Sequence, residues 1–180
     1  MHHRLKALLL ALCLASLPAW PAAAMAAAPV ALRGIKAVTV VVTGISPEAE
    51  HDGLKRSDLQ HDVEARLRDG GIKVLAPSER LQAPGQPHLM VRFIDQKRSE
   101  MDFYAISIAV HLVQNVRLAR DNKVVVPAET WGMTGVISVG AQELVSVRNL
   151  LLEYVDMFIK EAHAANAAAN AARPVTVAKP

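Results

Sequence analysis

A long alternating stretch between Tyr104 and Leu118 constrains the fold of this chain more than any other part of the sequence. Every second residue is bulky and almost always apolar, and the residues between them are small or polar. The bulky set is Tyr104, Ile106, Ile108, Val110, Leu112, Gln114, Val116 and Leu118. A period of two residues is typical of a β-strand that buries one face, whereas a helix would mix the two sets.

The residues after this stretch predict a hairpin partner for it. Residues 120–123, with the sequence Arg-Asp-Asn-Lys, suit a tight turn, because Asp and Asn tolerate positive φ angles. A two- or four-residue loop centred there brings bulky residues together on one face and small residues together on the other. The expected pairs are Leu112 with Trp131, Val110 with Met133, Ile106 with Ile137, Leu118 with Val125, Ala109 with Thr134, His111 with Gly132, and Val113 with Thr130. A three-residue loop would mix the faces.

Three further strands and two helices are predicted around this hairpin. The strands are expected at residues 35–43, 72–75 and 88–96, and the helices at residues 57–69 and 141–163, from their apolar periodicity. The predicted fold class is α+β, a two-layer α/β sandwich with the element order β-α-β-β-β-β-α and a long β-hairpin. Both helices are expected on the bulky face of the hairpin, which leaves the small-residue face without a cover.

The beginning of the chain has the features of a secretory signal peptide. A basic start is followed by an apolar run at residues 7–17 and by Ala-rich A-x-A cleavage sites at residues 22–26. The predicted organisation is a signal peptide at residues 1–26, a single α/β domain at residues 27–163 and a disordered Ala/Asn-rich tail at residues 164–180. The alternative, an uncleaved anchor, is disfavoured because the apolar run is too short to cross a membrane. We therefore expect a periplasmic or secreted protein with no membrane span in the mature chain.

Removal of this segment changes what the composition implies. Cys13, the only cysteine, lies within the apolar run, and Leu12 before it does not suit a lipoprotein cleavage site. The mature chain is thus expected to form no disulfide and no thiolate metal site. Loss of Arg4 and Lys6 leaves 18 basic residues of the original 20, against 17 acidic ones. The charge therefore gives no reason to expect nucleic-acid binding.

No catalytic or cofactor motif is found in the sequence. It lacks G-x-S-x-G, H-E-x-x-H, a P-loop and a dinucleotide-binding glycine pattern, so neither an enzymatic activity nor a cofactor is predicted. The nearest approach to a metal-binding set is His51, Asp52, His61, Asp62 and Glu64. A solvated polar helix face is the favoured interpretation of that set, and no metal is predicted.

Gln114 and Glu129 form the most unusual polar pair in the proposed hairpin. The expected register places them opposite each other on the otherwise apolar face. A carboxylate in such a place can have a raised pKa and act as an acid or base. No second carboxylate or nucleophile can be placed beside it, so a mutual hydrogen bond near the end of the core is the favoured interpretation.

Two surfaces of the hairpin are candidates for binding. The strand is longer than the final helix, so its far end is expected to extend beyond the core. The candidate partner-binding residues there are Val116, Leu118, Val125, Val126 and Pro127. The alternative is a bulge near Pro127 that folds this end back onto the core. The second surface is the small-residue face, which suits either a homodimer or partner contact, or an ordinary solvated face.

Two segments resemble a family of small exported bacterial proteins of unknown function. They contain Asp62-Val63-Glu64-x-x-Leu67-Arg68-x-x-Gly71-Ile72, then Thr130-Trp131, Val139-Gly140, Val155-Asp156-x-Phe158 and Asn166. The order of elements also resembles small α/β modules of envelope assembly, such as the lipopolysaccharide-assembly lipoprotein and the amino-terminal domain of TolB. The resemblance implies a role in the cell envelope and transfers no catalytic residue.

The sequence therefore predicts a non-catalytic periplasmic or secreted protein that binds another cell-envelope component. A small-molecule or lipid-binding module is the second interpretation, and an enzyme of unknown class is the third. A binding module predicts an apolar cavity, whereas an adaptor predicts exposed apolar surface.

Overall fold

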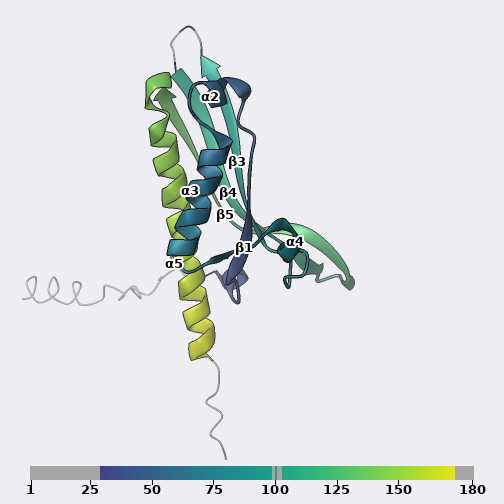
Figure 1. The fold of residues 1–180 in the computed structure, drawn as a ribbon. Coiled ribbons are helices and arrows are strands. Elements are labelled where there is room, and N and C mark those ends of the chain that lie inside the picture. The colour runs from purple at the N-terminus through teal and green to yellow at the C-terminus, as the bar shows by residue number, and fades with distance from the viewer. Residues whose placement is uncertain (1–28, 99, 101–102, 173–180) are drawn as a thin grey trace, which may run out of the picture.

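The computed structural model describes residues 29–98, 100 and 103–172, which form an α+β fold of two layers (Figure 1). Within these residues a five-stranded sheet has the order β2-β1-β3-β4-β5. The strands are β1 (Ala37–Thr43), β2 (Lys73–Val74), β3 (His88–Arg98), β4 (Phe103–Leu118) and β5 (Asp121–Gly140). The helices are α2 (Pro47–His51), α3 (Arg56–Asp69), α4 (Pro77–Arg80) and α5 (Val145–Ala171), with 3-10 turns η2 (Val30–Leu32) and η3 (Ala141–Glu143). The signal-peptide prediction for residues 1–26 lies outside the described residues.

The predicted fold class and the predicted order of the main elements are confirmed. β1 pairs in parallel with β2 and β3, while β3, β4 and β5 are antiparallel neighbours. Two short helices, α2 and α4, lie between the elements expected from the sequence. Pro47 and Pro77 each stand at the first helical position, where a missing N–H costs nothing. Ser46 also caps α2, since its Oγ accepts a hydrogen bond from the amide of Ala49 at 3.1 Å.

The predicted hairpin register is confirmed over its inner half. Leu112 pairs with Trp131, Val110 with Met133, Ile106 with Ile137, Ala109 with Thr134, and His111 with Gly132. The register is wrong beyond Leu112, where Val113 pairs with Glu129 rather than with Thr130. Thr130 is an extra residue in β5, and such a bulge shifts every later pair by one. At the far end Leu118 pairs with Asp121 rather than with Val125.

The core lies between the bulky sheet face and the two long helices, as expected. Tyr104, Ile106, Ile108, Val110 and Leu112 are all fully buried. Apolar residues of α3 and α5 meet them from above the sheet; these are Leu59, Val63, Leu67, Val147, Leu151, Val155 and Phe158. Trp131 meets Phe158 edge to face, with ring centroids 5.2 Å apart. The helices are also tied to each other by two 2.6 Å hydrogen bonds from Arg66 to Asp156.

The final helix is longer than the sequence predicts. α5 runs to Ala171, so the expected domain boundary at residue 164 falls inside this helix. Ala165 is fully buried, and Asn166 hydrogen-bonds to the chain before β1. Its side chain accepts from the amide of Gly34 at 2.7 Å and donates to the carbonyl of Ile35 at 2.9 Å. The first part of the predicted tail is therefore part of the domain, because it packs against the start of β1.

The hairpin bends away from the helix layer after the Thr130 bulge (Figure 1). Residues 116–126, here called the hairpin tip, extend beyond the body of the sheet and diverge from α5. The extended alternative is therefore the one found, although the bulge lies at Thr130 rather than near Pro127. Pro127 itself has no N–H to offer a further strand, which suits its position on the edge strand β5.

Candidate functional site

The candidate residues of the hairpin tip differ in their exposure. Val125 is 48% exposed, whereas Val116, Leu118 and Val126 are half-buried within the hairpin. Pro127, which follows the tip, is exposed. The structure places all five residues on the projecting part of the hairpin, but it divides their side chains between two faces. Val116 pairs with Val126 on one face, whereas Val125 and Pro127 lie on the other. Their role in binding stays a prediction.

The polar pair expected on the apolar face does not form. Gln114 lies opposite Ala128, and its Nε2 donates to Thr130 Oγ1 at 2.8 Å and to the carbonyl of Ala31 at 3.1 Å. Glu129 lies instead on the small-residue face, where its Oε2 is 2.9 Å from Nδ1 of His111. The physical reason is the bulge, since one inserted residue moves the following side chain to the other face of the sheet. The acid–base hypothesis for this pair is therefore wrong.

Glu129 and His111 border a shallow groove on the small-residue face. The groove has a volume of about 340 Å³ and is also lined by Trp131, Gly132 and Thr134. A side chain at position 132 would collide with the imidazole, because a Cβ there would lie 2.5 Å from Cδ2 of His111. The glycine thus lets His111 lie flat across β5, within 3.3 Å of Thr134 Oγ1.

The same face of the sheet carries the largest exposed apolar side chains of the strands. Ile94 on β3 is 66% exposed and Val136 on β5 is 74% exposed. Both pair with Ser107 on the strand between them, so they flank one small residue. Ala105 and Ala109 lie on either side of Ser107 on the same face of β4. Because α3 and α5 both lie on the opposite face, we call this surface the open face (Figure 1).

A polar cluster at the other end of the sheet was not predicted from the sequence. Asp52, which follows α2, accepts hydrogen bonds from Lys97 Nζ at 2.6 Å and from Tyr104 OH at 2.7 Å. These contacts, with that of Lys97 foremost, hold the pKa of Asp52 below its ordinary value. Burial, together with the hydrogen bond to Asp52, raises the pKa of Tyr104 to about 12. A carboxylate that is hard to protonate and a phenol that is hard to ionise make a structural contact rather than an acid–base pair.

This cluster borders a partly open cleft between the α2–α3 connection and the start of α5. The cleft has a volume of about 280 Å³ and a mixed lining. Charged side chains of both signs contribute to it, namely Asp52, Lys55, Asp58 and Arg148. Arg148 is already paired with Asp62 of α3. The cleft therefore differs from the apolar cavity that a lipid-binding module would need.

The acidic residues of the possible metal set each have a cationic partner instead. Asp52 pairs with Lys97, Asp62 with Arg148, and Glu64 with Arg68 at 2.8 Å. In the part of the chain that the structure describes, no group of three or more His, Cys, Asp or Glu residues could hold a metal ion. The pairs of Asp52 and Asp62 therefore fasten the segment before α3 and α3 itself to the rest of the fold, whereas the Glu64–Arg68 pair lies within α3.

Comparisons with known proteins add little to this geometry. No protein-family model matches the chain, and no curated protein matches it. Among solved structures, a PelC dodecamer from Paraburkholderia phytofirmans with one substitution is similar over 72% of this chain and 89% of its own, at 17% identity and a TM-score of 0.41. A second PelC dodecamer structure gives 15% identity and a TM-score of 0.40, over 72% of this chain and 88% of its own. This degree of similarity assigns neither a family nor a function to the chain.

None of the helices in the described residues combines the length and the hydrophobicity that a bilayer span requires.

Proposed function

We propose that this chain is a non-catalytic cell-envelope protein that binds another envelope component through the open face of its sheet. The observation that carries the proposal is the exposure of Ile94 and Val136 on either side of Ser107. Small side chains around them allow another surface to approach the sheet closely. Exposed apolar side chains on an uncovered sheet face favour a protein interaction site there.

The state of the polar groups supports a binding role rather than catalysis. Catalytic groups converge on a place where a substrate can sit, and their pKa values are shifted towards the working pH. Here Asp52 and Tyr104 are bonded to each other, and their pKa values are shifted away from neutrality. Asp95 is similarly occupied, because it accepts hydrogen bonds from the amide and the Oγ of Ser46.

The envelope location rests on the sequence of the first 26 residues. Their basic start, apolar run and small-residue cleavage sites favour export, and the rest of the chain has no cysteine. An exported chain that keeps one sheet face uncovered is best explained by a partner in the same compartment. Cell fractionation and the mass of the processed chain test the location separately from the binding face.

A photo-crosslinking amino acid at position 107 tests the open face in cells. We expect crosslinks from this position, because Ile94 and Val136 direct a partner onto the strand between them. The matched control is the same amino acid at Met157, which is 40% exposed on α5. Val136→Asp should abolish the crosslinks from position 107, since a charge would be buried at the contact.

The proposal fails if position 107 gives no crosslink while Met157 does, or if Val136→Asp leaves the crosslinks unchanged. A crosslinked product of twice the chain's own mass would identify the partner as a second copy. A product of another mass would identify an envelope component of a different kind.

A further inference from the structure

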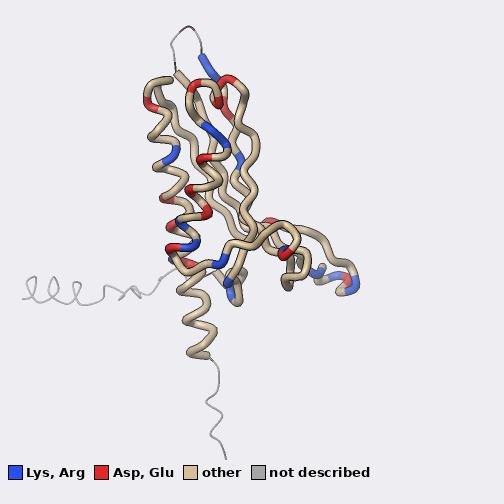
Figure 2. Tube along the Cα trace, viewed as in Figure 1, with Lys and Arg blue, Asp and Glu red and all other residues tan. Residues whose placement is uncertain are grey.

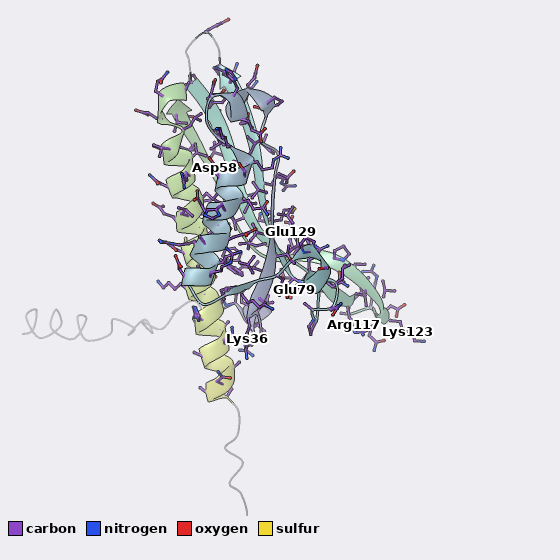
Figure 3. The ribbon with its side chains drawn as sticks, in the orientation of Figure 1. Lys36, Asp58, Glu79, Arg117, Lys123 and Glu129 are labelled. Atoms are coloured by element: carbon purple, nitrogen blue, oxygen red, sulfur yellow. The ribbon has the colours of Figure 1, made fainter. Side chains whose placement is uncertain are left out.

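The hairpin tip is chemically unlike the open face. Residues 116–126 contain three cations, Arg117, Arg120 and Lys123, and a single acid, Asp121. All four are exposed, and Figure 2 shows the basic residues at the projecting end of the chain. Figure 3 places Arg117 and Lys123 on this end, well away from the two long helices.

Only some of the charged side chains of the tip form hydrogen bonds within the hairpin. Arg117 Nη1 donates to the carbonyl of Asn122 at 2.8 Å, and Asp121 Oδ1 accepts from the amide of Lys123 at 3.0 Å. These bonds shape the turn. They leave the tip with an excess of positive charge that faces solvent, so the complementary surface is an anionic one.

Apolar side chains lie directly beside these cations. Val124 is 40% exposed and Val125 is 48% exposed, and they follow Lys123 in the chain. Arg and Lys side chains can reach outward to phosphate groups while apolar neighbours enter the boundary between headgroups and acyl chains. This combination suits a lipid surface better than a protein. Each partner in a stable protein interface buries about 800 Å² of surface, and two exposed valines provide far less apolar area than that.

We propose that the hairpin tip is a peripheral membrane-contact element that binds the surface of an anionic phospholipid bilayer. Val124 and Val125 enter the interfacial layer, and Arg117, Arg120 and Lys123 lie at the level of the lipid phosphates. The bend after the Thr130 bulge carries the tip clear of the helix layer, so the tip can reach a flat surface. This inference goes beyond the proposed function, since the open face is a separate surface of the sheet.

Vesicle sedimentation with the chain as processed by the cell tests the proposal. The probes are phosphatidylcholine vesicles and vesicles of phosphatidylcholine with phosphatidylglycerol. We expect binding to the anionic vesicles that weakens with added salt, and little binding to the neutral ones. Arg120→Gln with Lys123→Gln should weaken binding roughly 25-fold, about fivefold for each cation, while keeping the Arg117–Asn122 bond. Val124→Ser with Val125→Ser should weaken it by about tenfold.

A control with matched charge separates the tip from net charge. Lys55→Gln with Arg98→Gln removes two exposed cations elsewhere on the chain and should leave vesicle binding within about twofold of the unmodified chain, since cations more than a Debye length from the surface are screened. Equal loss in the control and the tip variant would overturn the proposal. Unchanged binding in both tip variants would also overturn it, as would a failure of the unmodified chain to bind anionic vesicles at low salt. If the unmodified chain does not bind anionic vesicles, an acidic protein is a better candidate than a bilayer for the binding partner of the tip. Crosslinking from position 107 is unaffected by any of these results.

Discussion

At the scale of single residues, Asp52 is the best example of a contact that joins distant parts of the chain. It follows α2 in the sequence, yet its carboxylate receives the side chains of Lys97 and Tyr104 from β3 and β4. The carboxylate closes that end of the core, where the buried phenol of Tyr104 would otherwise lack a partner. A single residue in a polar loop therefore joins the end of α2 to β3 and β4.

The lowered pKa of Asp52 predicts a specific loss of stability in acid. A depressed pKa in the folded state adds stability above the ordinary value of 3.8, and this stability is lost as the pH falls through the folded value. We expect Asp52→Asn to lower the free energy of unfolding at pH 7, and the difference from the unmodified chain to shrink as the pH falls towards 2. Urea denaturation across this pH range measures both. A difference that stays constant with pH would show that the charge of Asp52 is not responsible.

Tyr104→Phe tests the partner of Asp52 in the same way, in alkaline rather than acidic solution. Burial raises the pKa of Tyr104 to about 12, so its contribution is complete below pH 10 and is lost as the pH rises towards 12. The phenylalanine variant should be less stable than the unmodified chain at pH 7, because Asp52 loses a donor. The variant should also not show the loss of stability that ionisation of Tyr104 causes in the unmodified chain as the pH rises towards 12.

At the scale of whole elements, the last turns of α5 determine how the start of the domain is held. His163 Nε2 lies 2.7 Å from the carbonyl of Gly70 after α3, and Asn166 bonds to Gly34 and Ile35 before β1. Repeated alanines after His163 give few packing signals in the sequence, so no more than a brief prolongation of the helix was expected there. Alanine nevertheless has the highest helix propensity, and Ala165 is small enough to be buried against the fold.

Truncation of α5 tests this role. A chain that ends after His163 should lose about 2–3 kcal/mol of stability, about 1 kcal/mol for each Asn166 hydrogen bond and less than that for the burial of Ala165. A chain that ends after Ala172 keeps all these contacts and should match the full chain. Thermal and urea denaturation compare the two. Equal stability of both truncated chains would mean that the last turns of α5 contribute nothing to the domain.

At the scale of the whole molecule, both long helices lie on one side of the sheet and leave two different surfaces free. The open face exposes the apolar side chains of Ile94 and Val136 among small and polar residues, whereas the hairpin tip is basic and projects from the body (Figures 1 and 2). A two-layer fold has only one buried sheet face, so the other remains available for binding. On the two proposals above, one protein contacts two different kinds of surface through separate parts of its sheet.

The open face predicts weak self-association of the purified chain. Without its partner, we expect the exposed apolar side chains to bring copies together at high protein concentration. Val136→Asp should remain monomeric, and its free energy of unfolding should change by less than about 0.5 kcal/mol, because the side chain is 74% exposed. Size exclusion with light scattering over a range of concentrations measures this. Association that persists in the variant would place the contact elsewhere.

The amino-acid sequence by itself determined the sheet faces, the order of the main elements and the inner hairpin register. The alternation from Tyr104 to Leu112 is a local pattern, because the preference of each side chain for the buried or the exposed face follows from that side chain alone. The projection of the candidate tip residues beyond the helices also follows from the length of the alternating stretch, whereas their role in binding stays a prediction.

Only the tertiary structure decided the position of Glu129, the contacts of Asp52 and the end of α5. A single bulged residue at Thr130 moves the β5 residues on its hairpin side to the opposite face, and no local signal marks which residue bulges. The contacts of Asp52 and Asn166 join segments that are 45 to 132 residues apart. Such contacts depend on how the layers pack, and the free energy of packing belongs to the whole fold rather than to any stretch of sequence.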